Sequence, residues 1–381
     1  MEEIVEINKC TGCTACMSNC PKKAITMEVD GEGFKYPVID QKKCIDCGLC
    51  KKTCPVINTN CNDSLNECYA AFTKDDKYKN NSSSGEIFSL IANKILDDKG
   101  IVIGAAFDKD NKLKHIAITK KDELIKLIGS KYLQSDLDNI LSFVKENVDK
   151  KKILFVGTPC QVAGLKAFLK KDYDNLFCID LFCHGVPSPK LFQKYIKELE
   201  KDSNDTLLDY NFRDKSTGWD SYSNTATFKN SIKTELQKDN NYMKLFLADV
   251  SLRESCFNCN FKLGNKYSDI TLGDFWGIKD KYPEMYDKNG VSAIIINSKK
   301  GSKIFELISD ELKYKNCKLE EMASGNPMIK ESTKRPKGRN TFFKEIDNYN
   351  ICELANKYKK KIPLTKKIII KLKKAIEKMV K

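Results

Sequence analysis

Residues 10–21 read CTGCTACMSNCP, and residues 44–55 read CIDCGLCKKTCP. Both segments have the spacing C-x2-C-x2-C-x3-C-P, which is typical of proteins that bind two [4Fe-4S] clusters through thiolates. The first three cysteines of a segment bind one cluster, and the fourth binds the other cluster. The spacing assigns one cluster to Cys10, Cys13, Cys16 and Cys54, and the second cluster to Cys44, Cys47, Cys50 and Cys20. Because such clusters transfer single electrons, the two segments predict a redox protein with a dicluster ferredoxin-like domain.

Zinc and disulfides are the competing explanations for so many cysteines. Zinc sites usually contain paired C-x2-C steps, whereas each segment here has three cysteines in succession at that step. A disulfide scaffold is typical of secreted proteins, and residues 1–9 contain no apolar segment of the signal-peptide kind. The cluster interpretation is therefore preferred, and the many free cysteines indicate a reducing cytoplasm.

The composition of the chain excludes several classes of protein. Its 381 residues are enough for about two to three domains. It has no apolar segment of about 18 residues, the length that spans a membrane. His115 and His184 are its only histidines. This scarcity argues against multi-histidine metal sites and against a Ser-His-Asp hydrolase.

The net charge of +14 is concentrated at the carboxyl end of the chain. Residues 357–381 contain eleven lysines and one acid, Glu377, and so supply most of the excess. The remaining chain is only weakly basic, and nucleic acid is not expected as a partner. Leu364, Ile368 and Leu372 fall on one face of a possible helix. Two interpretations stay open: the helix packs on the protein itself, or it lies on the anionic inner face of a membrane, which would make the protein peripheral there.

The pattern after residue 60 is that of a mixed α/β domain. Strands alternate with helices at first and pair by hairpins later. We expect residues 1–60 to form the cluster domain, residues 61–330 the mixed domain, and residues 331–381 a linker and the basic helix. The expected strands are 101–107, 153–156, 176–182, 207–212, 222–228, 269–272 and 291–296. The expected helices are 87–96, 136–148, 159–169 and 190–200.

A second group of cysteines is placed where metal ligands could lie. Cys160 and Cys183 follow two buried strands, 153–156 and 176–182, and Cys256 and Cys259 form a C-x2-C pair. If the two strands are neighbours in a parallel sheet, their following loops open into the same crevice. The spacing alone leaves a third cluster, a redox dithiol and half a zinc site as alternatives.

Several further segments together resemble one known family. They are Ser82-Ser83-Ser84-Gly85, Ser130-Lys131-Tyr132-Leu133-Gln134-Ser135, Gly157-Thr158-Pro159-Cys160-Gln161, Cys183-His184-Gly185-Val186-Pro187-Ser188, Phe212-Arg213-Asp214-Lys215 with Gly218-Trp219, and Ser268-Asp269-Ile270-Thr271-Leu272-Gly273-Asp274-Phe275-Trp276-Gly277. The resemblance is to the coenzyme F-420 (8-hydroxy-5-deazaflavin) hydrogenase/dehydrogenase beta-subunit family, and it covers roughly residues 10–327. It implies an iron–sulfur flavoprotein that binds FAD, with a mixed-sheet flavin-binding domain.

The resemblance also implies site residues. It assigns a third cluster to Cys160, Cys183, Cys256 and Cys259. It places FAD against Ser83, Ser84, Gly85, Lys131, Tyr132, Gln134, Thr158 and Gln161, with the diphosphate at the start of the helix that follows Gly85. The sequence departs from the family pattern at Glu86, where many relatives have glycine, and a carboxylate there opposes a phosphate. Lys131, His184 and Asp274 are the expected polar residues of the catalytic pocket.

Two functions follow from these observations. The first is an oxidoreductase that couples hydride transfer at FAD to single-electron transfer through the clusters. A deazaflavin or another small redox substrate would exchange the hydride, and a ferredoxin or a redox partner subunit would exchange the electrons. The second is a non-catalytic adapter that only relays electrons to a partner, for example in polysaccharide biosynthesis. Bound flavin distinguishes the two.

Overall fold

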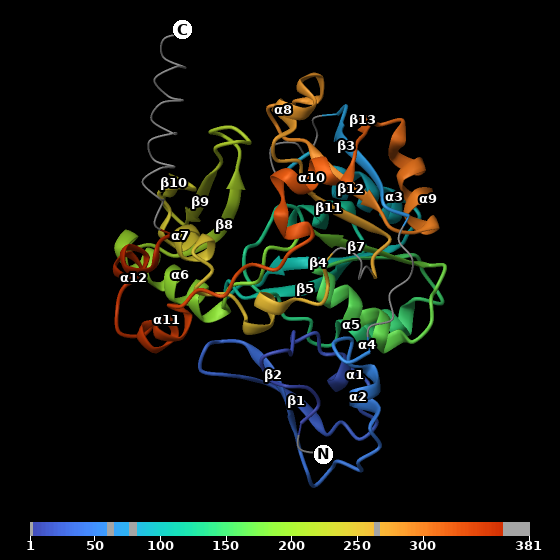
Figure 1. The fold of residues 1–381 in the computed structure, drawn as a ribbon, viewed down its shortest axis with the longest axis vertical. Helices are drawn as coiled ribbons and strands as arrows, with labels where there is room; N and C mark the ends of the chain where they lie inside the picture. Colours follow the sequence, from blue (N-terminus) through green and yellow to red (C-terminus); the bar gives the residue numbers. More distant parts are fainter. Residues whose placement is uncertain (1–2, 59–64, 76–81, 263–266, 361–381) are drawn as a thin grey trace.

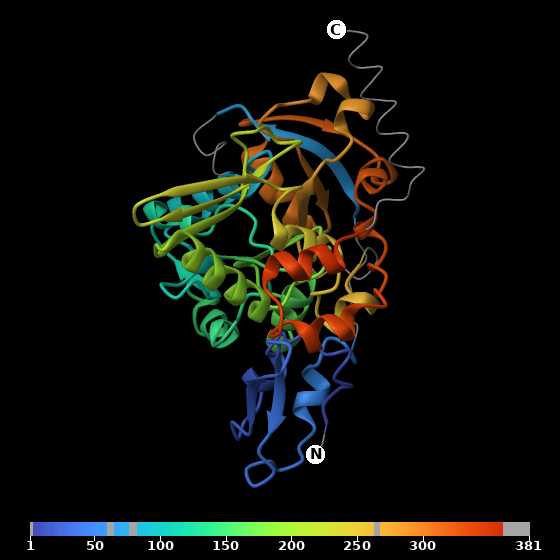
Figure 2. The ribbon, with the colours of Figure 1, turned by 90° about the vertical axis from the view of Figure 1, so that its left-hand side faces the viewer.

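A computed structural model describes residues 3–58, 65–75, 82–262 and 267–360. The cluster domain projects from one end of the molecule (Figures 1 and 2). Its two strands, β1 (Ile25–Val29) and β2 (Lys35–Ile39), form an antiparallel hairpin. Two short helices, α1 (Ala15–Ser18) and α2 (Leu49–Thr53), contain the last cysteine of the C-x2-C-x2-C triplets. The other six cysteines of the two segments lie in the loops beside these helices.

An eight-stranded sheet forms the centre of the large domain. Its strand order is β13-β3-β12-β11-β7-β6-β4-β5. The strands are β3 (Glu67–Thr73), β4 (Ile101–Phe107), β5 (Leu113–Ile118), β6 (Ile153–Val156), β7 (Leu176–Leu181), β11 (Ile270–Asp274), β12 (Ser292–Ile296) and β13 (Leu312–Asn316). The central strands β11, β7, β6 and β4 are parallel, and the outer strands are antiparallel. The mixed α/β fold predicted from the sequence is confirmed.

Helices cover both faces of this sheet, which explains why the central strands β4 and β6 contain no polar side chain. Alternate residues of β6 face opposite sides: Leu154 packs with α3 (Ile87–Asp97) and α9 (Lys299–Ser309), whereas Phe155 packs with α4 (Ile140–Asn147) and α5 (Pro159–Leu169). The shorter elements are η1 (Lys121–Lys126), η2 (Glu254–Asn258), α8 (Ile278–Lys281), η3 (Pro283–Met285), α10 (Leu319–Gly325) and η4 (Pro327–Ile329).

A smaller antiparallel sheet lies beside the large one. It contains β8 (Leu207–Asp214), β9 (Ser223–Phe228) and β10 (Ile232–Leu236). Its core is shared with α6 (Pro189–Ser203), α7 (Asn241–Leu247), α11 (Arg339–Glu345) and α12 (Ile351–Tyr358). Phe342 and Leu354 are fully buried there, so residues 339–358 are packed helices and not the linker that the sequence suggested. The basic segment after residue 360 lies outside the described residues.

Most expected elements occur close to their predicted positions. The strand at 101–107 has the predicted bounds, and β6 and β7 are parallel neighbours, as the crevice argument required. The helix expected over 136–148 begins only at Ile140, because Asp136 instead forms a bridge with Lys114. Outside the cluster domain, strands β3, β5, β10 and β13 were not predicted. Within the described residues, none of the helices is long and apolar enough to cross a membrane.

Arg253 of the large domain joins the two domains. Its side chain is 1% exposed, and its guanidinium donates to the carbonyl oxygens of Cys10 (2.8 Å) and Lys35 (2.9 Å) and to Oε1 of Gln134 (3.0 Å). The same group lies 4.1 Å from the ring centroid of Tyr36, a cation–π contact. One buried cation therefore holds both the first cysteine segment and the hairpin against the large domain.

Replacing Arg253 by Met should release the cluster domain from this contact. Each lost hydrogen bond from a charged donor costs about 1.5–3 kcal/mol, and Met fills part of the volume without replacing a donor. We expect faster amide hydrogen exchange in residues 10–20 and 34–39, measured by mass spectrometry. Arg335→Met is the matched control, because Arg335 pairs with Glu254 at the surface. Unchanged exchange in Arg253→Met would contradict this role.

Candidate functional site

The first cluster site gathers cysteines from both segments. One cavity in the cluster domain is lined by Cys10, Cys13, Cys16 and Cys54. Burial raises the pKa of the Cys13 thiol to about 12, and the nearby Cys54 and Cys10 thiols act in the same direction. Burial also raises the pKa of Cys16, again with Cys13, Cys10 and Cys54 contributing. The structure thus brings together the four cysteines that the crossed spacing rule assigned to one cluster.

The second cluster site is lined by the other predicted set, Cys20, Cys44, Cys47 and Cys50. Burial raises the pKa of Cys50, and Cys47 and Cys20 contribute to the same shift. The backbone amide of Ala24 donates to the Cys20 sulfur at 3.3 Å. Such amide–sulfur hydrogen bonds are among the features that set cluster potentials. Four soft thiolate donors with an amide at one sulfur fit a [4Fe-4S] cluster.

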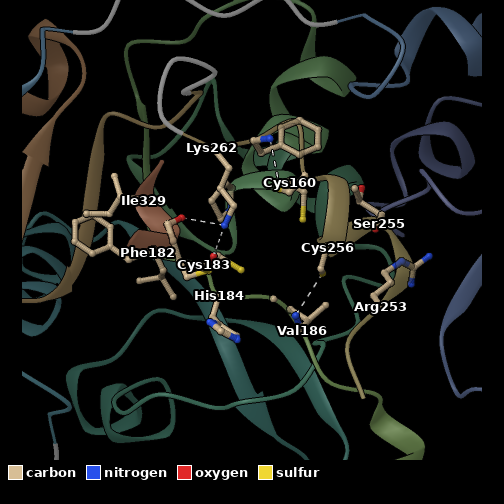
Figure 3. A pocket seen from close by; sticks show the side chains of 17 residues that line it. Cys160, Phe182, Cys183, His184, Val186, Arg253, Ser255, Cys256, Lys262 and Ile329 are labelled. Atoms are coloured by element: carbon tan, nitrogen blue, oxygen red, sulfur yellow. Dashed lines mark hydrogen bonds between the residues drawn. The ribbon is translucent and has the colours of Figure 1, made fainter. Parts of the chain in front are cut away.

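The remaining four candidate cysteines line a third cavity, called here the four-cysteine cavity. Cys160 stands at the start of α5, directly after β6, and Cys183 follows β7. Cys256 belongs to η2, and Cys259 comes directly after it. Figure 3 shows the sulfurs of Cys160, Cys183 and Cys256 facing a shared space. The parallel pairing of β6 and β7 places two of the thiols, and η2 supplies the other two.

The surroundings of the four-cysteine cavity also suit thiolates. The amide of Val186 donates to the Cys256 sulfur (3.5 Å), and the amide of Phe261 donates to the Cys259 sulfur (3.4 Å). Burial raises the pKa of Cys160, and Cys259, Cys183 and Cys256 add to the shift. Bound iron would compensate this repulsion, since metal binding favours the deprotonated thiol.

A cluster site differs from a site for a single metal ion. Among the described residues, no three His, Cys, Asp or Glu side chains are grouped as the ligands of one metal ion. In a [4Fe-4S] cluster each thiolate binds a different iron, so its four sulfurs stand farther apart than the ligands of one ion. Each of the three cavities is lined by four cysteines, the number that one such cluster requires.

A further cavity, of about 210 Å³, lies at the carboxyl ends of β6, β7 and β11, and we call it the strand-end cavity. This is the edge at which open parallel sheets usually bind ligands. Leu181 lines both the strand-end cavity and the four-cysteine cavity. The Thr158 hydroxyl, which lines the strand-end cavity, lies 3.2 Å from the Cys160 sulfur. A ligand in the strand-end cavity would therefore be adjacent to the third group of thiols.

Five of the eight residues predicted to bind FAD line the strand-end cavity: Ser83, Ser84, Lys131, Thr158 and Gln161. Some of their side-chain polar atoms already form hydrogen bonds within the protein. Thr158 and Gln161 form the capping box of α5, and the Gln161 amide also donates to the Ser135 hydroxyl at 2.9 Å. The Ser83 hydroxyl accepts from the amide of Ser130 at 2.7 Å. By contrast, the buried Ser84 hydroxyl has no hydrogen-bond partner in the described part of the protein.

The other three predicted residues do not line that cavity. Gly85 is packed so closely that a Cβ atom would lie 2.4 Å from the Ala71 carbonyl oxygen, so its role is steric. The Tyr132 ring packs against Phe212 and Phe246. Gln134 donates from Nε2 to the Thr11 carbonyl oxygen (3.1 Å) and accepts from Arg253. Gln134 therefore contributes to the domain contact.

The start of α3 differs from the open anion site that the sequence suggested. Glu86 is the N-cap residue, with a left-handed φ of 71°, and its side chain is 3% exposed and lines the strand-end cavity. A carboxylate already complements the positive end of the helix dipole here. The diphosphate position predicted at this helix is therefore disfavoured by charge.

The three expected catalytic residues lie in different places. Lys131 lines the strand-end cavity, its Nζ donates to the Ile128 carbonyl oxygen (2.8 Å), and burial lowers its pKa to about 7. Asp274 also lines this cavity, but its Oδ1 accepts from Trp219 (2.8 Å) and Arg213 (3.1 Å). His184 lines the four-cysteine cavity, and its Nε2 is 2.5 Å from Oδ1 of Asp249. These three roles stay predictions.

His115 is a cavity residue that the sequence analysis did not select. It is 5% exposed and lines the strand-end cavity, and its Nε2 lies 2.9 Å from the Val156 carbonyl oxygen. Burial lowers its pKa to about 4, so the ring is neutral near pH 7 and Nε2 carries the proton. Nδ1 is then an acceptor without a partner among the described residues. The sequence signal that could have identified His115 is its alternation with Leu113, which places both residues on the same, buried face of a strand.

The fold and these sites define an iron–sulfur oxidoreductase with a ligand cavity at its sheet edge. Comparisons with known proteins identify the family. Residues 150–321 match the family that comprises the carboxyl-terminal part of coenzyme F420 hydrogenase/dehydrogenase beta subunits, and residues 9–58 match the 4Fe-4S dicluster domain. The chain therefore contains a carboxyl-terminal domain of this beta-subunit family and an N-terminal dicluster domain, which agrees with the predicted resemblance and with two [4Fe-4S] clusters.

Individual relatives are distant. A subunit of the F(420)H(2) dehydrogenase from Methanosarcina mazei is 22% identical over 90% of this chain and 94% of its own length. An uncharacterized protein of Methanocaldococcus jannaschii, MJ1349, is 26% identical over 53% of this chain, and the match spans 65% of that protein. A chain of the F420-reducing [NiFe] hydrogenase complex from Methanosarcina barkeri aligns with a TM-score of 0.48 and 16% identity, over 75% of this chain and 93% of that chain.

Replacing Cys54 by Ala tests the crossed ligation. Although Cys54 belongs to the second segment, its loss should remove the cluster of the first segment, or about four irons per chain. Iron analysis and electron paramagnetic resonance of the anaerobic protein would measure this. Cys352→Ala is the control, because Cys352 is exposed and far in sequence from both segments. Loss of the second cluster's signal instead of the first would contradict the assignment.

Proposed function

We propose that the protein is an iron–sulfur flavoprotein that couples hydride transfer at FAD to single-electron transfer through [4Fe-4S] clusters. FAD supplies the conversion between two-electron and one-electron chemistry when bound. The hydride donor or acceptor is proposed to be a deazaflavin or another small redox substrate. The Methanosarcina mazei relative, which is named as part of an F(420)H(2) dehydrogenase, supports this substrate class and a role within a complex with partner subunits.

One observation carries the proposal: the strand-end cavity is directly adjacent to the four-cysteine cavity. Leu181 lines both, and the Thr158 hydroxyl contacts the Cys160 sulfur. A two-electron cofactor in the strand-end cavity would thus be separated from a third cluster in the four-cysteine cavity by a single layer of side chains. Such proximity is what an exchange between hydride and single electrons requires.

Unpaired polar atoms in its wall make the strand-end cavity suitable for FAD. Two buried atoms, Ser84 Oγ and His115 Nδ1, have no hydrogen-bond partner among the described residues. Buried polar groups are normally hydrogen-bonded, so a ligand with polar groups is expected beside them. A flavin offers donors for the His115 acceptor in its ring N–H group and its ribityl hydroxyls.

Lys131 is the residue that can place a positive charge in the cavity: burial lowers its pKa to about 7, and a bound diphosphate would favour the protonated form. Of the described residues that line it, Lys131 is the only lysine or arginine. The carboxylate of Glu86 disfavours a phosphate at the start of α3, so we assign the attraction of the FAD diphosphate to Lys131. Backbone carbonyls of Lys126 and Ile128 orient its ammonium group. Lys131 thus binds and orients, and the hydride chemistry is the cofactor's own.

The first cluster site is placed to continue the path from the four-cysteine cavity. Thr11 lines both cavities, and Cys13 packs against α5, where a Cβ on Gly164 would lie 2.6 Å from the Cys13 Cβ. Every residue that lines the second cluster site belongs to the cluster domain. We therefore propose the order FAD, third cluster, first cluster, second cluster, with the second cluster outermost.

Iron content tests the third cluster. The wild-type protein, purified without oxygen, should contain about twelve irons, and Cys160→Ala should contain about eight. Cys317→Ala is the control, since Cys317 lines none of the three cysteine cavities described above. About eight irons in the wild-type protein would confine the clusters to the N-terminal domain and refute the third.

Flavin binding tests the strand-end cavity. Ser84→Ala removes an unpaired buried hydroxyl and should weaken FAD binding by about twofold to tenfold, the value of one hydrogen bond. Ser251→Ala is a matched control, because Ser251 has an equally unpaired buried hydroxyl that does not line this cavity. His115→Phe keeps a ring to stack on Phe155 and should weaken FAD binding further. The dissociation constants would be measured by flavin fluorescence.

Two results would overturn parts of this proposal. Equal FAD affinities in Ser84→Ala, His115→Phe and Ser251→Ala would exclude the strand-end cavity as the flavin site. A wild-type protein with full iron content that binds no FAD would refute the flavoenzyme, and a non-catalytic electron-transfer adapter would then be the remaining function.

A further inference from the structure

The second cluster site lies entirely within the cluster domain, which projects from the large domain (Figure 2). Of its four cysteines Cys47 is exposed, whereas Cys10, Cys13 and Cys54 of the first site are buried. The neighbouring side chain of Ile45 is 57% exposed. An exposed ligand brings the cluster close to the protein surface, where an electron can enter or leave.

Lysines surround this site. Six exposed lysines each lie within three residues of one of its cysteines: Lys22, Lys23, Lys42, Lys43, Lys51 and Lys52. The same segments contain two acids, Asp40 and Asp46, and Asp40 pairs with Lys43 at 3.2 Å. We call these six lysines, together with Ile45 and Cys47, the lysine surface. It combines a strong positive charge with a small apolar centre.

We propose that the lysine surface is the docking site for a small acidic one-electron carrier protein. The inference rests on the proposed electron-transfer function and names the partner's chemistry and its contact surface. Complementary charge steers such a carrier to the outermost cluster, and Ile45 provides the short-range apolar contact. One electron passes between the carrier's redox centre and the second cluster, and no bond or proton is transferred.

The charge pattern favours a folded acidic carrier over an extended anionic surface. The lysines are neighbours in sequence of the one N-terminal site that has an exposed cysteine, so they add positive charge near the point where the electron must pass. An exposed isoleucine, Ile45, lines the same site and offers an apolar contact of the kind that interfaces combine with a charged rim. A membrane would need only the charge, and it is kept as an outcome of the test.

The test uses the full-length anaerobic protein with its clusters loaded. Lys22→Glu, Lys42→Glu and Lys52→Glu are combined in one variant, and iron content is measured first. The control variant combines Lys150→Glu, Lys151→Glu and Lys229→Glu, three exposed lysines of the large domain. Reduced acidic [2Fe-2S] ferredoxin is the probe, and bleaching of the cluster absorbance is followed by stopped flow. This readout does not require flavin, so it separates the docking proposal from the flavin proposal.

The expected result is a drop of about tenfold or more in the second-order rate constant with ferredoxin at low salt. The rate constants of the variant and the wild type should become equal above roughly 0.5 M salt, because salt screens the charges. Reduction by methyl viologen, which is a cation, should not slow. Wild-type rates in the surface variant, or an equal drop in the control variant, would overturn the proposal.

A second variant tests the apolar centre. Ile45→Ser should slow reduction by ferredoxin several-fold at all salt concentrations, while Ile232→Ser, which changes a 71% exposed isoleucine on β10, should not. If both the lysine and the Ile45 variants react like wild type with ferredoxin but lose binding to vesicles of anionic lipid, the lysine surface is a membrane contact and the carrier proposal is wrong.

Discussion

The parallel pairing of β6 with β7 is the constraint on which the candidate sites depend. Parallel neighbours end at the same edge of a sheet, so Cys160 at the start of α5 and Cys183 in the loop after β7 lie at that one edge. The capping box of Thr158 then starts α5 directly at the cysteine. The same strand ends form the floor of the strand-end cavity. The parallel pairing of β6 with β7 therefore places the thiols of the four-cysteine cavity next to the strand-end cavity.

The contact between the two domains follows from a second constraint, the need to pair a buried cation. Arg253 can be 1% exposed only because three oxygen acceptors and an aromatic ring surround its guanidinium. Those acceptors come from the first cysteine segment, from the hairpin and from Gln134. Arg339 is equally buried and forms an ion pair with Glu32 of the hairpin. Two buried arginines thus orient the cluster domain.

The sequence was most informative where chemistry fixes the spacing. The cysteine segments predicted the crossed sets in each cluster cavity, and apolar runs predicted the central strands. The sequence was less informative where contacts between residues far apart in the chain determine how a side chain or a helix packs. Tyr132 and Gln134 share a motif with Lys131, yet their side chains pack in an aromatic core and at the domain contact. The packing of residues 339–358 also depends on partners far away in the chain, such as α6 and α7.

Unequal burial of the two N-terminal cluster sites has a consequence for oxidative damage. The first site is covered by α5. This helix packs directly against Cys13, because Gly164 has no side chain to hold the two apart. The second site has only its own loops for cover, with Cys47 exposed. Dissolved oxygen therefore reaches the outer cluster first. On exposure to air, the protein would lose the cluster of the second site while the cluster of the first site is still intact.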